Sequence, residues 1–583
     1  MSPRIAIIGA GFGGLCMAIQ LERAGITSYT VFEKAGEVGG TWRDNSYPGA
    51  GCDIPSHLYS FSFEKYASWT RRYPGQPEIL GYLAHCADKY GVRGKIRFHT
   101  EVSAAVFDGD HWHLTTRPSG TADAPATQST PPPNPGTSPP DGLRHDGPQA
   151  DSPGNDGLRA DIPGTERPGA GIPGADVPRD ERPGADILGA DIPEDEGPRA
   201  DSPRVDGPQD DGPRDERSVL GVGGVRIEEF DVVVAGVGQL NRPLVPDIPG
   251  MADFEGVSFH SARWNHDHDL SGRRVAVIGT GSSAAQFIPP VAGRAGHLDV
   301  FQRTPNWVIP KPDAAFGPLT RLALHFVPGL QRAYREWIYR YAEGTLYPAL
   351  ARGWSEGLLR KRALGHLRAQ VADPGLRAKL TPDYPPGCKR VVIDSRFYPA
   401  LTRPNVDVVT DRIVRITAKG VETTRGLREA DTIIYGTGFR STEFLAPIAF
   451  TGRGGQRLDE RWKQGAEAYL GISVPDFPNL FLLYGPNTNL GHNSIIFMIE
   501  CQVNHIMNCL PYLSDRGPME VRPEAMTAWS RQLDVAMARM VWGNGCRSWY
   551  KTSEGRVTNN WPGPTPLYRK LTALPPLPAY RFG

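Results

Sequence analysis

The stretch Ile5-Ala-Ile-Ile-Gly-Ala-Gly-Phe-Gly-Gly14 decides the fold of the N-terminal part of this chain. Four apolar residues precede a GxGxxG loop, and apolar side chains recur at helical spacing over residues 15–24. Residues 28–33 are then predicted to form a second strand. The order strand, glycine loop, helix and strand predicts a parallel α/β sheet whose first turn binds the pyrophosphate of a dinucleotide at a helix N-terminus.

The end of the second predicted strand indicates which dinucleotide binds there. Glu33 occupies the position at which a carboxylate accepts hydrogen bonds from ribose hydroxyls. A carboxylate also repels a 2′-phosphate, so this first site favours FAD or NAD over NADP. The residues expected to bind this cofactor are Gly9, Gly11, Phe12, Gly14 and Glu33.

A second unit of the same kind starts at Arg274. An apolar run over 275–278 leads into Gly279-Thr-Gly-Ser-Ser-Ala284, a GxGxxA loop, and the strand after the next helix ends in Arg303. An arginine at this position is suited to a 2′-phosphate. The second site therefore favours NADPH, and the residues expected to bind it are Gly279, Thr280, Gly281, Ser282, Ser283, Arg303 and Thr304.

These two units predict an α/β protein with two Rossmann-type dinucleotide-binding domains, one for FAD and one for NADP, and a helical subdomain. Two sites of opposite 2′ preference imply that NADPH delivers hydride to a bound flavin. Buried-strand patterns that end in Gly236-Val-Gly238 and Gly436-Thr-Gly438 fit two crossings between the domains. The expected FAD-binding parts are 1–116, 225–265 and 431–583, and the NADPH-binding domain is 266–430 with a helical insertion at about 314–380.

Composition changes sharply near Thr116. From about Arg117 to about Gly224, Pro, Gly, Asp, Arg and Ala dominate, and Phe, Tyr and Trp are absent. Such a segment buries too little apolar surface to offset its ordering entropy, so we predict a long disordered insert over 117–224. The flanks 111–116 and 225–229 resemble the two arms of one hairpin, so the insert splits a domain. A neutral repeat expansion and an interaction tether are both open as its role.

The balance of charges and the spacing of the cysteines argue against several kinds of binding site. The 583 residues contain 64 basic and 64 acidic side chains, which gives no global electrostatic case for nucleic acid or an acidic membrane surface. The seven cysteines form no CxxC pair and show no metal-ligand spacing. We therefore expect no metal site and seven reduced thiols, as in a cytosolic protein. The cysteines are Cys16, Cys52, Cys86, Cys388, Cys501, Cys509 and Cys546.

The N-terminus and the hydropathy pattern predict a cytoplasmic location. Residues 1–4 lead straight into the first apolar run, which breaks at once into the glycine loop, whereas a signal peptide needs a longer apolar stretch. No run of about 18 apolar residues occurs, so we expect no membrane span.

A further motif carries a resemblance to a known family. Phe254-Glu-Gly-Val-Ser-Phe-His260-Ser-Ala-Arg-Trp264-Asn265 resembles the fingerprint FxGxxxHxxxW(P/D) of type I Baeyer–Villiger monooxygenases. Related flavin-containing and N-hydroxylating monooxygenases usually have Tyr or Phe in place of Trp264, and Asn265 stands where Pro or Asp is usual. The resemblance extends over the whole chain except 117–224, and its ending, Gly485 to His492, is most similar to the branch that includes hydroxyacetophenone monooxygenase.

The resemblance implies the chemistry. Reduced flavin would trap O2 as a C4a-peroxide, which attacks a ketone as an anion. Arg390 matches the catalytic arginine of the family, and its permanent positive charge would favour that anion and stabilise the oxyanion that follows. Asp53 matches the aspartate that contacts and orients this arginine.

Other positions take expected roles from the same resemblance. Lys389 is expected to help Arg303 hold the 2′-phosphate, and the fingerprint residue His260 to support domain movement without carrying a proton. Trp549 resembles a tryptophan that touches the nicotinamide cofactor. The further residues expected at the flavin are Thr41, Trp42, Tyr59 and Gly485, the last near its pyrimidine end.

Four functions remain distinguishable. The first is oxygen insertion next to a ketone carbonyl, giving an ester or lactone, with sulfide oxidation as a side activity. The second is N- or S-oxygenation by an electrophilic flavin hydroperoxide. Trp264 and Arg390 favour the first, and Asn265 leaves the second open. An NADPH-dependent disulfide reductase needs a redox cysteine pair, which the absence of CxxC argues against. A non-enzymatic scaffold conflicts with the intact glycine loops. The substrate and the oligomeric state cannot be read from the pattern.

Overall fold

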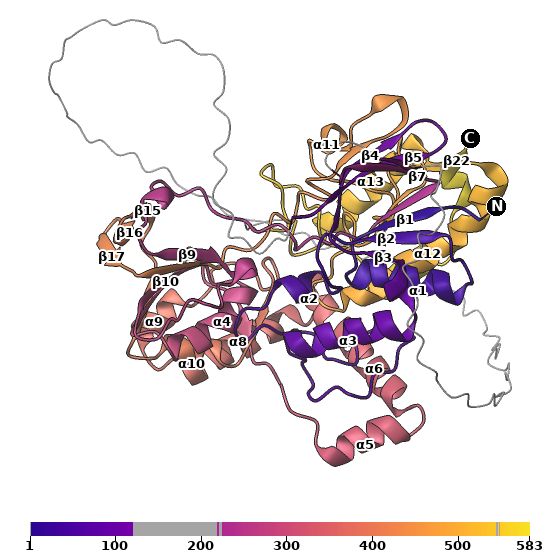
Figure 1. Ribbon diagram of the computed structural model, residues 1–583. Helices are drawn as coiled ribbons and strands as arrows, with labels where there is room; N and C mark the ends of the chain where they lie inside the picture. The colour runs from indigo at the N-terminus through magenta and orange to yellow at the C-terminus, as the bar shows by residue number, and fades with distance from the viewer. Residues whose placement is uncertain (1, 121–217, 221–223, 544–545, 547) are drawn as a thin grey trace, which may run out of the picture. The chain divides into compact units, whose positions relative to one another are not determined.

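The first glycine loop belongs to a five-stranded parallel sheet of order β20-β8-β1-β2-β3 (Figure 1). The computed structural model describes residues 2–120, 218–220, 224–543, 546 and 548–583. Helix α1 (Phe12–Arg23) follows β1, as the sequence predicts. All four residues of β1 are buried, because α1 and neighbouring segments cover the sheet. The strands are β1 (Ile5–Ile8), β2 (Tyr29–Phe32), β3 (Ile96–Arg97), β8 (Val232–Ala235) and β20 (Leu480–Leu482).

The second glycine loop belongs to another five-stranded parallel sheet, of order β14-β11-β10-β18-β9. Helix α4 (Ser282–Ala292) follows β10. Strands β9 and β18 are part of this sheet, although they lie outside the range 266–430 expected for this domain, because each extends the β10 edge. The strands are β9 (Val257–His260), β10 (Arg274–Ile278), β11 (His297–Phe301), β14 (Val406–Val409) and β18 (Thr432–Tyr435).

A third sheet, of order β19-β4-β5-β7-β6, contains the two flanks of the predicted insert. Strand β5 pairs antiparallel with β7, with Trp112 opposite Phe230, which confirms the predicted hairpin. Strand β5 extends to Pro118 and β6 adds to β7, so paired strands continue into both ends of the range 117–224 expected for the insert. Residues 121–217 and 221–223, with most of the predicted disorder, lie outside the described residues. The strands are β4 (Thr100–Phe107), β5 (Trp112–Pro118), β6 (Ser218–Leu220), β7 (Arg226–Phe230) and β19 (Ala449–Thr451).

A run of helices lies between the short parallel strands β12 (Val308–Ile309) and β13 (Val392–Ile393). Figure 1 shows α5 at the periphery, next to α6. From α6, Arg335 donates hydrogen bonds to the carbonyl of His57 (2.7 Å) and to that of Ser60 (2.9 Å), which joins the helical run to the FAD-side segment. The helices are α5 (Pro318–Phe326), α6 (Leu330–Tyr341), a π-helix (Ala342–Leu346), α7 (Tyr347–Leu350), α8 (Glu356–Gln370) and α9 (Pro374–Lys379).

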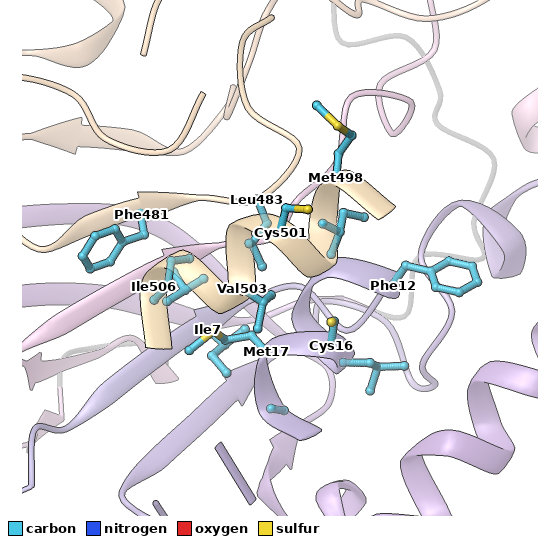
Figure 2. Close-up of a cluster of buried hydrophobic side chains, with 14 of the residues drawn as sticks. Ile7, Phe12, Cys16, Met17, Phe481, Leu483, Met498, Cys501, Val503 and Ile506 are labelled. Carbon is cyan, nitrogen blue, oxygen red and sulfur yellow. The ribbon is translucent and has the colours of Figure 1, made fainter. Parts of the chain in front are cut away.

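Helix α12 (Ile495–Arg516), the longest helix of the described residues, packs with α1 over the first sheet. Figure 2 shows Val503 and Ile506 of α12 facing Ile7 of the sheet and Met17 of α1, while Met498 points to the other side of the helix. These side chains are buried, so the C-terminal part completes the core that positions the first glycine loop. Within the described part of the chain, no helix is long and apolar enough to cross a membrane.

The remaining elements are short or peripheral. The helices are α2 (Thr41–Asp44), α3 (Gln76–Lys89), α10 (Phe397–Leu401), α11 (Leu458–Arg461), α13 (Pro523–Ala538) and α14 (Thr565–Thr572). The strands are β15 (Ile413–Thr417), β16 (Gly420–Thr423), β17 (Gly426–Glu429), β21 (Met519–Val521) and β22 (Tyr580–Phe582).

The cysteines differ from the expectation at one pair. Cys388 and Cys546 are joined by a disulfide, with their Cα atoms 6.3 Å apart and a sequence separation of 158. The expectation of seven reduced thiols is therefore wrong for this pair, because tertiary contact and not CxxC spacing brings the two sulfurs together. The other five cysteines are free and buried.

Candidate active site

One cavity of about 990 Å³ lies at the carboxyl ends of both parallel sheets and is lined by both glycine loops. Ligands of open α/β sheets bind at this edge. Gly14, Lys389 and Gly485 do not line it. The predicted site residues on its wall are Gly9, Gly11, Phe12, Glu33, Thr41, Trp42, Asp53, Tyr59, Gly279, Thr280, Gly281, Ser282, Ser283, Arg303, Thr304, Arg390 and Trp549.

The first loop is built around backbone contacts that exclude side chains. Gly9 has φ +98°, and a Cβ there would lie 2.9 Å from the carbonyl oxygen of Gly236. A Cβ on Gly14 would lie 1.8 Å from the carbonyl oxygen of Gly9, so Gly14 allows α1 to approach β1 from behind the cavity. The N-cap of α1, Gly11, provides no side-chain cap, and the first turn has no acidic residue. The helix N–H groups are thus suited to an anionic pyrophosphate.

Glu33 lines the cavity beside the first glycine loop. Its carboxylate accepts hydrogen bonds from the backbone N–H groups of Ala10 and Ala35 (2.9 Å each) and from Arg43 (3.0 Å). The residue is 4% exposed and faces the cavity. These three donors hold the carboxylate in one orientation beside the glycine loop, where ribose hydroxyls would reach it.

Three aromatic residues form one corner of the cavity. The Trp42 indole N–H donates to the Tyr59 hydroxyl (3.1 Å), and the ring of Tyr59 packs edge-on against Phe12 with centroids 5.2 Å apart. Burial raises the pKa of Tyr59 well above its usual value. These three side chains therefore present uncharged aromatic surface to the cavity.

The second loop, like the first, has a glycine at positive φ packed against a backbone carbonyl. Gly279 has φ +112°, and a Cβ there would lie 2.4 Å from the carbonyl oxygen of Gly436. Asn306 donates a hydrogen bond to the carbonyl of Thr280 (2.7 Å) and holds the loop from the side. By contrast, a Cβ on Gly281 would meet no protein atom within 4 Å, because this residue faces the cavity. Close backbone packing therefore requires glycine at position 279, whereas glycine at position 281 leaves space for a ligand.

Two cations meet beside this loop. Lys389 donates a hydrogen bond to the Thr304 hydroxyl, and its ammonium lies 4.8 Å from the centre of the Tyr384 ring. Burial and then the charge of Arg303 lower the pKa of Lys389. Among the described residues, neither Arg303 nor Lys389 has an ion-pair partner within 4.0 Å. A bound phosphate would neutralise both, so these residues fit a 2′-phosphate.

Arg390 and Asp53 form the charged centre of the cavity. Arg390 donates to both carboxylate oxygens of Asp53, with Nη2–Oδ2 at 2.7 Å, Nη2–Oδ1 at 2.9 Å and Nε–Oδ2 at 3.2 Å. Burial alone would raise the pKa of Asp53, but Arg390 outweighs it and the pKa lies below its usual value. Asp53 in turn raises the pKa of Arg390 despite burial. The Arg390 side chain is still 30% exposed, toward the cavity.

The sequence pattern missed the residue that links the two glycine-loop units. Gln286 on α4 donates to the carbonyl of Gly51 (2.9 Å), and its amide oxygen accepts from the Tyr47 hydroxyl (3.0 Å). These bonds hold the loop that carries Asp53 against the helix of the second site. No local signal marks a glutamine for such a contact, although it faces the cavity from the helix after the second loop.

The segment around Gly485 differs from expectation in which residue faces the cavity. A Cβ on Gly485 would lie 2.3 Å from the carbonyl oxygen of Gly471, so Gly485 packs away from the cavity. Tyr484 faces it instead, and its hydroxyl donates to Asn489 (2.6 Å). Its position directly before the quoted motif is the signal that could have found it.

The fingerprint residues lie behind the cavity wall. Trp264 packs against Phe287 of α4 with ring centroids 5.4 Å apart. The Asn265 side-chain oxygen accepts a hydrogen bond from the backbone N–H of Asp267 (3.1 Å), a bond that an aspartate would also make. His260 accepts from the N–H of Ala262 (3.0 Å), and burial lowers its pKa to about 4. His260 is thus neutral near pH 7 and does not line the cavity.

One cluster outside the cavity has the composition of a metal site. Ligand atoms of His297, Asp299 and Asp407 lie within 4.8 Å of one another. Arg428 already binds Asp299 (3.4 Å) and Asp407 (3.1 Å), so one guanidinium pairs with both carboxylates.

The fold and the cavity together define a protein with two dinucleotide-binding units that line one cavity. Residues 7–73 match the NAD(P)-binding Rossmann-like domain family, and residues 223–322 match the flavin-binding monooxygenase-like family. A Baeyer-Villiger monooxygenase of Streptomyces coelicolor is 36% identical over 99% of this chain and 92% of its own length. Another, from Pseudomonas aeruginosa, is 34% identical over 98% of this chain and 89% of its own.

Solved structures agree in fold. An oxidized steroid monooxygenase bound to NADP is 26% identical, covers 100% of this chain and 99% of its own, and has a TM-score of 0.72. The closed form of cyclohexanone monooxygenase has a TM-score of 0.72 at 24% identity, with the same coverage. The chain belongs to the Baeyer–Villiger monooxygenase family.

Proposed function

We propose that this chain is an FAD-containing, NADPH-dependent monooxygenase that inserts one oxygen atom of O2 next to a ketone carbonyl and forms an ester or a lactone. The observation that carries this proposal is the Arg390–Asp53 pair on the wall of a cavity shared by both glycine loops. A permanent positive charge at that place serves a reaction in which negative charge develops on oxygen.

Two different sets of residues on or next to the cavity wall fit the two cofactors. Glu33 and the uncapped N-terminus of α1 suit the ribose and pyrophosphate of FAD. Arg303 and Lys389 suit the 2′-phosphate of NADPH. When bound, the flavin accepts hydride from NADPH and activates O2.

The residues of the chain would position and stabilise the reacting groups. Arg390 stabilises negative charge on the attacking oxygen and on the former carbonyl oxygen of the substrate. Asp53 accepts hydrogen bonds from two guanidinium nitrogens and so holds the charge in one place. The aromatic corner of Phe12, Trp42 and Tyr59 would flank the flavin ring, with Thr41 beside it. Trp549, also on the wall, would touch the nicotinamide cofactor.

The division into domains follows the two parallel sheets. We assign the FAD-binding domain to the segments that supply β1, β2, β3, β8 and β20, with the third sheet attached. The NADPH-binding domain would extend from β9 to β18, which moves both expected borders outward, to about 255 and 436. The helical run between β12 and β13 belongs to this second domain by chain order.

We also infer a cytoplasmic location, supported by the use of NADPH as a reductant that cells keep in that compartment. Fractionation of cells that express the full chain tests this. Protein in the clarified cytosolic fraction with a cytosolic marker enzyme is the expected result, and protein released with periplasmic or membrane markers contradicts it.

The central test is product analysis with the purified, yellow holoenzyme. An aryl ketone should accelerate NADPH consumption and yield an ester that contains one oxygen atom from ¹⁸O2. Equal consumption with and without ketone, with all oxygen recovered as hydrogen peroxide, would contradict the proposal. Oxygenation of amines or sulfides but of no ketone would instead favour the N- or S-oxygenating alternative.

A further inference from the structure

The disulfide lies between two segments that contribute to the cavity. Cys388 directly precedes Lys389 and Arg390, and Cys546 lies three residues before Trp549. We propose that Cys388 and Cys546 are a reversible redox modification site, whose disulfide form holds these two segments together and so strengthens the retention of the nicotinamide dinucleotide. The effect on the dinucleotide rests on the proposed function, whereas the redox chemistry of the pair does not.

Packing around the pair shows how closely the two segments depend on each other. Cys388 is fully buried in an apolar cluster with Trp542 and Tyr550, and Cys546 packs against the same cluster while remaining half-buried. The Trp542 indole N–H donates to the carbonyl of Gly387 (2.9 Å), one residue before Cys388. The half-buried Cys546 is the side from which a small oxidant or reductant would reach the sulfurs.

Each segment also reaches the cavity. On one side, Lys389 binds Thr304 and Arg390 binds Asp53. On the other, Trp549 lies on the cavity wall, and its backbone carbonyl accepts a hydrogen bond from Ser441 (2.9 Å). A covalent bond between the segments restricts how far Trp549 can move from the cations. Because ordering is then completed before the dinucleotide binds, the oxidised protein should bind it more tightly.

The other thiols of the described chain are poorly suited to reversible disulfide formation. All five are buried and unpaired. Burial raises the pKa of each one: Cys16, Cys52, Cys86, Cys501 and Cys509. Thiols with raised pKa values form little thiolate, which is the reactive species.

The oxidation step balances with hydrogen peroxide as the oxidant. The Cys546 thiolate attacks one peroxide oxygen and becomes a sulfenic acid, while the other oxygen leaves as hydroxide and is protonated to water. The Cys388 thiol, which lies beside Cys546, then attacks this sulfur and gives up its proton, and the sulfenic oxygen leaves as a second water. Two thiols and one peroxide thus give one disulfide and two waters. A dithiol reductant reverses the change by two exchanges through a mixed disulfide, as in a reducing compartment.

The test uses the full-length holoenzyme in two states, one treated with excess dithiol and one then exposed to hydrogen peroxide. Alkylation after denaturation and intact-mass measurement should show seven modified cysteines in the first state and five in the second. Peptide mapping should identify the bridge. Calorimetric titration with NADP⁺ should give a dissociation constant about threefold to tenfold lower for the oxidised state.

Variants separate this pair from general oxidation. Cys546→Ser should bind NADP⁺ equally in both states, whereas Cys501→Ser, a matched change at a buried thiol, should keep the difference. Seven modified cysteines in both states would overturn the proposal. A bridge without a change in affinity would overturn its coupling to the dinucleotide. Absence of NADP⁺ binding in both states would count against the proposed function and the coupling, while the alkylation result would still decide whether the pair is a redox site.

Discussion

Arg390 binds Asp53 through two guanidinium nitrogens across a separation of 337 residues in sequence. The pair joins the loop after the first glycine unit to the strand that follows the helical run. Its charges are matched, yet Arg390 keeps 30% of its surface toward the cavity. A charge that is held in place and still accessible can act on a bound group.

Replacement of the arginine tests that role. We expect Arg390→Ala to lower ester formation by about 10²- to 10³-fold, the effect of removing one oxyanion-stabilising donor, while FAD remains bound. NADPH oxidation should continue and yield hydrogen peroxide. Product analysis beside NADPH consumption measures both. Arg340→Ala, at an exposed arginine of α6, is the control, and ester formation at the wild-type rate in Arg390→Ala would contradict the assignment.

Selectivity for NADPH should depend on the cation beside Lys389. Arg303→Ala should raise the KM for NADPH by about 10- to 100-fold, since a charge-assisted hydrogen bond contributes about 1.5–3 kcal/mol. The KM for NADH, which has no 2′-phosphate, should change little. Steady-state kinetics with both nucleotides give the comparison. Equal losses with NADPH and NADH would mean that Arg303 supports the loop and not the phosphate.

The two glycines of the second loop should respond differently to a methyl group. Gly279→Ala places a Cβ 2.4 Å from a backbone oxygen at φ +112°. We therefore expect a lower melting temperature for the protein measured without NADPH. Gly281→Ala meets open space, so its melting temperature should match the wild type while NADPH binding weakens. Thermal denaturation and nucleotide titration of both variants check this. Similar destabilisation by the two changes would refute the distinction.

Acid stability should depend in part on His260. Burial lowers its pKa from 6.5 to about 4, so the unfolded chain binds this proton at a higher pH than the folded chain. Its contribution to stability is complete above pH 6.5 and is lost as the pH falls toward 4, by up to ~3 kcal/mol. His260→Asn keeps an acceptor for Ala262 and should reduce the loss of stability between pH 7 and 5. Denaturant unfolding at several pH values measures this loss, with the exposed His325 replaced by Asn as the control. Parallel pH profiles for wild type and His260→Asn would exclude the effect.

Removal of the insert should leave the flavin site intact. Strands β5 and β6 both pair antiparallel with β7, so they run parallel to each other, and Ser218 and Leu114 both lie opposite Glu228. A linker from Gly120 to Ser218 must therefore cross two strand spacings, about 10 Å, and also run back along the strands by about 20 Å. Twelve Gly and Ser residues reach about 40 Å and should suffice in place of 121–217. The flavin absorbance per polypeptide should equal that of the full chain. Loss of FAD from a folded deletion variant would show that the insert contributes to the site.

The features that could be predicted from the sequence are those formed by residues close together in the chain. Both glycine loops, Glu33 and Arg303 are local, because a strand, a tight turn and a helix N-terminus occupy a few consecutive residues. The hairpin of β5 and β7 was also readable, since alternation persists in each arm. Arg390 and Asp53 could be named only through a family resemblance, as nothing near either residue predicts the other.

The tertiary structure alone decided which distant residues meet. In the folded chain, Cys388 meets Cys546, and Gln286 connects the two glycine-loop units. Tyr484, and not Gly485, faces the cavity. Strands β9 and β18 pair in the second sheet, although both lie outside the range expected for that domain. These contacts arise when helices and sheets pack over a shared core, and packing carries no signature in the spacing of residues along one chain.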